Sequence, residues 1–466
     1  MKFKKILRSF ELDLCSADDP PQEVLEKRKQ SLNKFETKIS DEIDRESFPD
    51  LEFSNRYRVP FPFLNQVLKL NRSSLIISED SSQIDAFSSY GVNILGKEYY
   101  EKFTKDAVRD SEEFGFFLNS IHPVVLENIK ILKKLSGMDA VSFHMSGTEA
   151  VLNACRLAKF NTEKKYIYKF KDSYHGWASI PDLKEIKTLK ELKKANNCAA
   201  VLINPLQYLY PVGSVKADAL LFIGNTPDKL SLSKYTNFLR EVREICDQNG
   251  ILMILDEIFM GFRLAFGGCQ EYFGVKADMV LYGKTLGGGL PVGVVCGRKD
   301  TMRKFDPEHP LLFLPNRGTF AAHPLVMLSM NQFLKHINRE MYVGNDERWN
   351  LRILELNKKI SKYNLSFNNM GSILSINHNN LSIYNWILQL YFKKNKLYLG
   401  PYGSSRLIFK VFMNCMEWES IEKVIVSSIE EMDADGWLYS RFKTKKEIYF
   451  FYIKILIKET IKNANN

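Results

Sequence analysis

A lysine ahead of three glycines is the residue of this sequence whose surroundings most suit chemistry. Lys284 stands in the stretch MVLYGKTLGGGLPVG, directly after a short apolar run. A lysine amine at the end of a strand, on a loop too rich in glycine to crowd it, suits attack on a carbonyl or a standing imine. Because glycine-rich loops have many uses, a surface lysine in a flexible turn is the competing interpretation.

A carboxylate occupies a comparable position after another apolar run. Asp256 ends the stretch ILMILD, in which residues 251–255 predict a buried strand. Open α/β sheets bind ligands at the carboxyl ends of their strands, and a carboxylate buried there needs a positive partner. The competing interpretation is an aspartate that caps the turn after the strand.

Two further segments offer groups for a flat, anionic ligand. The first, FHMSGTEAVLNACRLA, predicts a strand that leads through Ser146, Gly147 and Thr148 into a helix. The N–H groups and the dipole of such a helix start bind anions, although the same residues also form a good N-cap. The second, KDSYHGW, contains Tyr174, whose ring suits stacking, and His175, which either forms a hydrogen bond or merely packs.

Together, the four features supply what one cofactor demands. Pyridoxal 5'-phosphate (PLP) requires an anion site, an aromatic face, a carboxylate at its ring nitrogen and a lysine for its aldehyde. Because the protonated ring withdraws electrons during the reaction, the carboxylate belongs to the mechanism through a charge-assisted hydrogen bond. The sequence therefore predicts a PLP enzyme with Lys284 and Asp256 as its catalytic residues, and it predicts no metal site.

The elements that must position these residues follow from the hydrophobic pattern. From Ser120 onward, helical stretches alternate with the short apolar runs AVSFH, YIYKF, AAVLI, ILMIL and MVLYG. This alternation predicts an α/β fold with a mostly parallel sheet covered on both faces. We expect four regions: a charged helical lead-in (1–55), a large domain (56–330), a smaller α+β domain (331–440) and a basic tail (441–466).

Composition narrows the classes of protein. The net charge of +10 is not gathered into one long basic block, although some of it lies at the two ends, so nucleic-acid binding is not expected. The seven scattered cysteines without a CxxC pair, together with an N-terminus that lacks an apolar signal region, predict a cytoplasmic protein. No apolar run is long enough for a membrane span. In the tail, IYFFYIKILIK predicts a helix that docks on the body or a partner, with membrane-surface attachment as the alternative.

Several motifs, taken as a set, resemble a known family. The segments SGTEA, YHGW, DEIFMGFR, GKTLGGGLPVGVVCGR and RGTFAAHP resemble the class III aminotransferases of PLP fold type I, from about residue 57 to residue 440. Within the family the sequence is similar to glutamate-1-semialdehyde aminomutase. It is closer still, in phrases such as SSYGVNILG, to aminomutase-like aminotransferases that accompany polyketide and nonribosomal peptide synthases. The resemblance implies a mixed, mostly parallel seven-stranded sheet between helices, and a smaller α+β domain that the N-terminal segment completes.

The resemblance also implies roles for individual residues. Lys284 forms the Schiff base with the cofactor and moves a proton between the substrate Cα and the cofactor C4′ atom, while Asp256 pairs with the ring nitrogen. The residues implied to contact the cofactor are Ser146, Gly147, Thr148, Tyr174, His175, Asp256, Lys284 and Thr319. Since Thr319 would reach the phosphate of the neighbouring subunit, the resemblance implies an obligate homodimer with shared active sites.

Two departures from the family pattern bear on the substrate. Asn204-Pro205 stands where many members have Glu-Pro, so the glutamate that can mask a substrate-binding arginine is absent. Arg406, in SSRLIF, stands where carboxylate-binding aminotransferases carry an arginine, and a guanidinium suits bidentate carboxylate binding. A structural ion pair is the alternative for Arg406.

These residues predict an aminotransferase that transfers an amino group from an amino donor to a keto or aldehyde acceptor. The resemblance to the synthase-associated aminotransferases implies a free or carrier-bound acceptor and a role in specialised metabolism. The segment 161–197 shows little of the long gating loop expected for the aminomutase, which favours this interpretation. The alternatives are glutamate-1-semialdehyde 2,1-aminomutase or another PLP isomerase. A third alternative is a non-catalytic binding module with the same fold.

Overall fold

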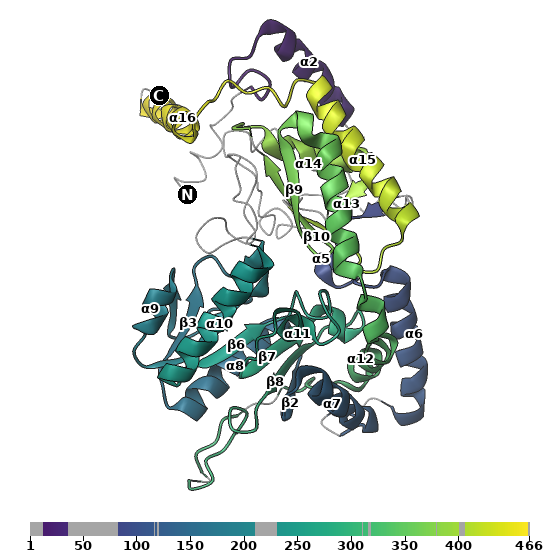
Figure 1. Cartoon of the computed structure of the whole chain (residues 1–466), viewed down its shortest axis with the longest axis vertical. Coiled ribbons are helices and arrows are strands. Elements are labelled where there is room, and N and C mark those ends of the chain that lie inside the picture. The colour runs from purple at the N-terminus through teal and green to yellow at the C-terminus, as the bar shows by residue number, and fades with distance from the viewer. Residues whose placement is uncertain are drawn as a thin grey trace.

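The apolar runs form one seven-stranded sheet in the computed structural model (Figure 1). The structure describes residues 13–35, 83–115, 117–118, 121–209, 231–309, 311–315, 318–378, 380–399 and 406–464. The strands are β2 (Ala140–His144), β3 (Tyr166–Phe170), β4 (Leu183–Ile186), β5 (Cys198–Ile203), β6 (Leu252–Asp256), β7 (Met279–Gly283) and β8 (Gly293–Gly297). Their order is β2-β8-β7-β6-β5-β3-β4, with parallel pairing from β4 to β7 and β8 antiparallel to both its neighbours. The predicted mixed, mostly parallel sheet is confirmed.

Helices cover both faces of this sheet because its strands are apolar on both sides. Along β6, Leu252 and Ile254 join the core beneath α8 (Gly147–Thr162), whereas Met253 and Leu255 join the core on the opposite face. The helices whose residues line that opposite core are α6 (Lys97–Phe114), α7 (Pro123–Ser136), α9 (Leu189–Lys193), α10 (Leu232–Asn249), α11 (Gly268–Phe273) and α12 (Pro324–His336). Alternation of side chains along each strand thus divides one set of apolar residues between two layers.

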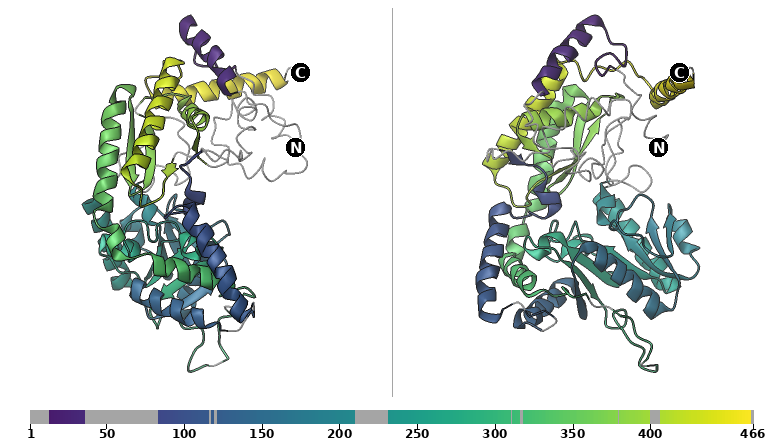
Figure 2. Two further views of the ribbon diagram at one scale, coloured as in Figure 1. Left: turned by 90° about the vertical axis from the view of Figure 1, so that its right-hand side faces the viewer. Right: turned by 180° about the vertical axis from the view of Figure 1, so that it is seen from behind.

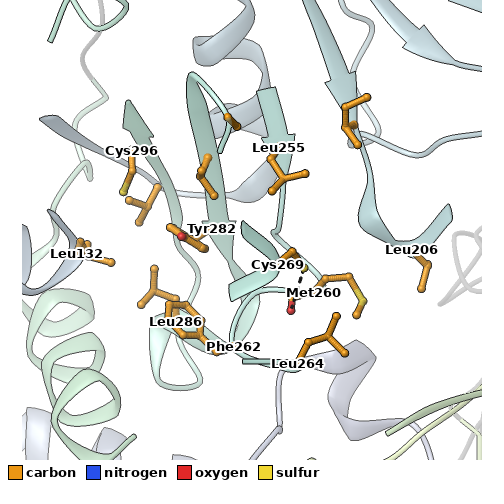
Figure 3. Packing of buried hydrophobic residues seen from close by; sticks show 14 of the residues in the cluster. Leu132, Leu206, Leu255, Met260, Phe262, Leu264, Cys269, Tyr282, Leu286 and Cys296 are labelled. Atoms are coloured by element: carbon orange, nitrogen blue, oxygen red, sulfur yellow. Dashed lines mark hydrogen bonds between the residues drawn. The ribbon is translucent and has the colours of Figure 1, made fainter. Parts of the chain in front are cut away.

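The opposite core extends beneath the segment that carries the candidate lysine (Figure 3). Tyr282, on β7, packs its ring 5.3 Å from that of Phe262, and Leu286 lies in the same cluster. All three side chains are buried. The strand end before the lysine is therefore rigidly supported from below.

A second core belongs mainly to the C-terminal part of the chain. Strands β9 (Leu365–Met370), β10 (Ile373–His378) and β12 (Arg406–Ile408) form an antiparallel sheet, and β1 (Ile84–Asp85) pairs with β11 (Leu397–Tyr398). The helices of this part are α13 (Asn345–Ile360), α14 (Leu388–Lys394), α15 (Cys415–Ala434) and α16 (Lys445–Ala464). The two parts lie end to end along the long axis of the molecule (Figures 1 and 2). The predicted domain boundaries themselves stay a proposal.

The N-terminal segment packs against this second part. Of the predicted helical lead-in, α2 (Gln22–Leu32) is described, and residues 1–12 and 36–55 lie outside the described residues. The buried guanidinium of Arg28 forms an ion pair of 2.7 Å with Asp18 and donates to the Gly436 and Tyr439 carbonyl groups. Its carbon centre also lies 4.3 Å from the centroid of the Tyr384 ring. These contacts fasten α2 to the chain that follows α15.

Candidate active site

The parallel pairing of β6 with β7 brings the predicted carboxylate and the predicted lysine to one edge of the sheet. Asp256 is the last residue of β6 and pairs in register with Leu281, and Lys284 directly follows β7. Lys284 begins the short 3-10 helix η4 (Lys284–Gly287) and has a φ of 44°, a left-handed conformation unusual for a residue with a side chain. Such conformations persist where the surrounding structure determines them, and they gather at functional sites.

The loop that carries the lysine is held in place by neighbouring side chains. Thr285 Oγ1 lies 2.5 Å from the hydroxyl of Tyr100, which also accepts the Ile94 amide at 3.1 Å. Burial raises the pKa of Tyr100 to about 12, so its hydroxyl stays protonated. A Cβ on Gly288 would lie 2.4 Å from the Ser329 carbonyl oxygen, so only glycine permits this approach. These contacts argue against the interpretation of a flexible surface turn.

Two aromatic rings flank the lysine amine. Lys284 is half-buried, and its Nζ lies 5.3 Å from the centroid of the Tyr90 ring and 5.7 Å from that of Phe259. A cation within about 6 Å of a ring centroid is attracted by the ring's quadrupole. Neither ring was predicted from the sequence. Phe259 follows Asp256 in the segment DEIFMGFR, whereas Tyr90 lies far away in the chain.

Tyr90 reaches this position on a strained turn. Ser88, Ser89, Tyr90 and Gly91 have successive φ values of 48°, 48°, 59° and 85°. The Ser88 amide donates to Asp85 Oδ1 at 2.7 Å, and the Ser88 hydroxyl donates to a carbonyl oxygen of β12 at 2.8 Å. Left-handed conformations at side-chain-bearing residues cost about 1–3 kcal/mol each, so this turn depends on its tertiary contacts.

A buried arginine ties this turn to the body of the molecule. Arg263 donates to the Gly91 carbonyl at 2.9 Å, to Ser372 Oγ at 3.1 Å and to the Phe409 carbonyl at 3.3 Å. Burial lowers the pKa of Arg263 to about 10. The arginine of DEIFMGFR thus joins the large sheet, the smaller sheet and the segment that carries Tyr90.

The predicted carboxylate is buried and hydrogen-bonded to the predicted histidine. His175 Nδ1 lies 2.8 Å from Asp256 Oδ2, and the Ile258 amide donates to Oδ1 at 3.2 Å. Because an ionised carboxylate only accepts, the proton of the first bond sits on Nδ1. The second ring nitrogen lies 3.0 Å from Ser173 Oγ. Asp256 therefore caps the turn after β6, as the competing interpretation holds, and it keeps lone pairs that a ligand's N–H group could use, so its role toward a ligand stays a prediction.

The predicted anion site is packed against the carboxylate segment. Ser146 is the N-cap of α8 and its hydroxyl accepts the Glu149 amide at 3.2 Å. The amides of Gly147 and Thr148 belong to the first turn, whose N–H groups have no acceptor within the helix. A Cβ on Gly147 would lie 2.8 Å from Ile258 Cγ2. The N-cap interpretation is correct for Ser146, and the same helix start offers donors next to the Asp256 segment.

The aromatic loop joins the same site. Gly176 has a φ of 97°, and a Cβ on it would lie 2.8 Å from Thr148 Oγ1, so the YHGW loop touches the helix start closely. Tyr174 is 42% exposed, which leaves ring surface available for a ligand. Its carbonyl accepts Asn204 Nδ2 at 2.9 Å, and Asn204 Oδ1 accepts the Leu206 amide at 3.0 Å. The Asn204 amide thus braces the loop, and its predicted substrate role stays a prediction.

Gln207 is a candidate site residue that the sequence reasoning missed. It lies in the 3-10 helix η3 (Pro205–Tyr208) after β5 and is 6% exposed. Its buried Oε1 has no hydrogen-bond partner within the described parts of the chain. An unsatisfied polar atom at this sheet edge fits a ligand that supplies the missing donor. The only sequence signal was its place after an apolar strand.

Two predicted residues belong to other segments of the chain. Thr319 is exposed after a hairpin that projects from the large sheet (Figure 1). Arg406 is 7% exposed and begins β12, in register opposite Ser375. Both residues lie on other segments than those that carry Ser146, Tyr174, His175 and Asp256, so both roles stay predictions.

The residues at this edge fit PLP. The start of α8, whose first amides have no acceptor within the helix, adjoins a partly exposed aromatic ring, a buried carboxylate and a half-buried lysine. The unsatisfied Oε1 of Gln207 adds an acceptor for a bound group. These are the groups that the phosphate, ring, ring nitrogen and aldehyde of PLP require.

Known proteins resemble this chain in sequence and in fold. A model of the class III aminotransferases matches residues 63–181 and 232–428. The chain is 27% identical over 423 residues to the glutamate-1-semialdehyde 2,1-aminomutase of Cytophaga hutchinsonii, which covers 82% of this chain and 91% of that one. Similar solved structures include the β-phenylalanine aminotransferase of Variovorax paradoxus (TM-score 0.65, 20% identity, 88% of this chain and 98% of that one). Another is a glutamate-1-semialdehyde aminomutase of Pseudomonas aeruginosa PAO1 (TM-score 0.64, 14% identity, 91% and 100%).

The family match spans more than half of the chain, and the fold agrees with PLP fold type I. The chain therefore belongs to the class III aminotransferase family of PLP-dependent enzymes.

Proposed function

We propose that this enzyme is an aminotransferase that moves an amino group from an amino donor to a keto or aldehyde acceptor. The observation that carries the proposal is the place of Arg406 on β12. The Ile408 amide on this strand donates to the Ala86 carbonyl at 2.8 Å, just before the turn that presents Tyr90 to Lys284. Arg406 lies two residues before Ile408 on the same strand, and an arginine in this part of the chain suits a donor's carboxylate.

Each residue of the site has a distinct task in this proposal. PLP, when bound, supplies an aldehyde for the lysine amine and a ring that withdraws electrons from the reacting carbon. The Lys284 amine holds and moves the proton at the substrate Cα. The Asp256 carboxylate keeps a proton on the ring nitrogen. The hydrogen bond of 2.8 Å between His175 Nδ1 and Asp256 Oδ2 fixes the orientation of the carboxylate. The amides at the start of α8 hold the phosphate, and the ring of Tyr174 stacks on the cofactor.

We further propose a homodimer in which Thr319 of one subunit contacts the phosphate held by the other. A hairpin just before Thr319, in which Phe305 bridges Phe313, projects from the large sheet (Figure 2). Its tip exposes Leu311 to 95% and Leu312 to 56%. Large exposed apolar side chains grouped in this way are typical of protein interfaces. Thr319→Ala should then weaken PLP binding while the dimer persists in light-scattering measurements.

We also propose a cytoplasmic location and a role in specialised metabolism. The seven free cysteines among the described residues support a cytoplasmic location. A role in specialised metabolism, with a free or carrier-bound acceptor, rests on the resemblance of motifs such as SSYGVNILG alone.

The second candidate is glutamate-1-semialdehyde 2,1-aminomutase, the activity named for several relatives, including that of Cytophaga hutchinsonii. The two functions differ in their need for partners, because isomerisation requires no external donor or acceptor. A screen of amino acids as donors, followed by absorbance and mass spectrometry, separates them. We expect donors to shift the cofactor band and to release a keto acid. Conversion of one substrate to its isomer, with every donor inert, would contradict transamination.

A further inference from the structure

Helix α16 has apolar side chains on two sides, and one of these sides packs against the described part of the chain. Ile448 is fully buried, and Phe451 and Tyr452 pack against the core of the C-terminal part. The ring centroid of Phe451 lies 5.5 Å from that of Phe442 in the segment before the helix. We call this side the inner face. It accounts for the docking of the helix that the sequence predicted.

The other side, which we call the outer face, consists of Tyr449, Phe450, Ile453 and Ile457. These side chains are 54%, 61%, 47% and 54% exposed. Tyr449, Ile453 and Ile457 follow one another at intervals of four residues, so they form a continuous stripe about 12 Å long. Figures 1 and 2 show α16 at the outside of the molecule, with its end directed away from the C-terminal part. A helix with apolar side chains on two sides normally has both of them covered.

The positive charge of the tail indicates what kind of surface binds the outer face. Residues 441–466 contain seven lysines and arginines and two glutamates, a net charge of +5 out of +10 for the whole chain. Lys443, Lys445, Lys446 and Lys454 are exposed at the start of the helix and beside the outer face. A second copy of the helix would bring two such clusters together, and like charges repel. The surface that complements the outer face is therefore apolar and anionic.

We propose that the outer face of α16 binds an anionic phospholipid surface. Helices with aromatic and aliphatic residues on one side and lysines beside them lie in the interface plane of a bilayer, with the apolar side among the acyl chains. The ring of Tyr449 suits this depth because it has an apolar body and a polar tip. No helix within the described residues has the length and apolar composition to cross a membrane, so the contact is a surface contact. Lysines attract such a surface within a Debye length.

The test is flotation of the full-length, PLP-loaded protein with lipid vesicles. We expect binding to vesicles of phosphatidylcholine mixed with phosphatidylserine and none to pure phosphatidylcholine. The bound fraction should fall as sodium chloride is raised, because salt screens the attraction. Phe450→Ser with Ile453→Ser should weaken partitioning at least tenfold, since two apolar side chains leave the acyl region. Lys445→Gln with Lys446→Gln should weaken it roughly 25-fold, about fivefold for each charge.

A matched control lies on α13. Leu354 is 52% exposed there and Lys358 is exposed one turn later. Leu354→Ser with Lys358→Gln makes one substitution of each kind elsewhere on the surface and should leave partitioning unchanged. Circular dichroism of every variant should match the wild type, because all of these side chains are exposed.

Four outcomes would overturn the proposal. The first is a wild type that binds no vesicle, and the second is equal binding to both vesicle types at any salt concentration. The third is an equal loss in the α13 control. The fourth is self-association of the wild-type protein in sedimentation velocity that is lost in the Phe450 and Ile453 variant, together with no binding to vesicles. That result would assign the outer face to a second copy of the chain.

Discussion

The hydrogen bond between His175 and Asp256 provides a quantitative prediction about the site. The two side chains are 2% and 6% exposed, and the bond length is 2.8 Å. Because water does not replace a donor at such a depth, His175→Phe leaves the carboxylate with the Ile258 amide as its remaining described donor. A hydrogen bond to a charged group contributes about 1.5–3 kcal/mol, and a buried acceptor without its donor incurs the desolvation cost in full.

A double-mutant cycle measures this bond. We expect His175→Phe and Asp256→Asn each to lower the unfolding free energy of the apoenzyme, measured in urea. The double variant should lose little more than the worse single variant, which gives a coupling energy of about 1.5–3 kcal/mol.

The matched control is the neutral pair of His144 and Asn153, whose Nε2 and Nδ2 atoms lie 3.1 Å apart. Burial lowers the pKa of His144 to about 4, so this pair is uncharged near pH 7. We expect His144→Phe and Asn153→Leu to couple by only about 0.5–1.5 kcal/mol. A coupling for His175 and Asp256 that is no larger than the control, or below about 0.5 kcal/mol, would refute the positioning role.

Three further predictions follow from single contacts. Gly147→Ala places a methyl group 2.8 Å from Ile258 Cγ2. We expect this variant to bind PLP about tenfold more weakly, or weaker still, in a titration of the apoenzyme. An unchanged affinity would contradict the close packing. Burial raises the pKa of Glu257 from 4.5 to about 7, so stability present at low pH should decline by about 3 kcal/mol as pH rises from 4.5 to 7. Glu257→Gln should remove that slope in unfolding curves, and a slope that persists would point to other groups. Tyr100→Phe loses the 2.5 Å hydrogen bond to Thr285 and should slow turnover about fivefold without changing the cofactor absorbance band. Full activity of this variant would show that the bond does not position Lys284.

The parts of the site that the sequence predicts are those that follow apolar strands. Asp256 and Lys284 end or follow runs that are fully buried in β6 and β7. Alternation of strands and helices in the sequence predicts that these strands are parallel. The carboxyl ends of parallel strands lie at one edge of the sheet, so residues that follow them come together. The same holds for Ser146 at the start of α8, because a strand followed by an N-cap is readable within a few residues.

Tyr90 could not be predicted because long-range packing places it. Tyr90 reaches Lys284 only because a left-handed turn is held by Asp85, by β12 and by Arg263. No local pattern records contacts among such distant segments. The brace from Asn204 to the Tyr174 carbonyl is similar, since the sequence indicates the amide but not its acceptor.

Attachment of the cofactor to Lys284 is the central claim, and it has a direct measurement. The PLP-loaded enzyme is reduced with borohydride, digested and analysed by tandem mass spectrometry. We predict a phosphopyridoxyl group on Lys284 in the peptide that contains GKTLGGG, and none in Lys284→Ala. A label on another lysine, or no label on a wild type that contains PLP, would contradict the account.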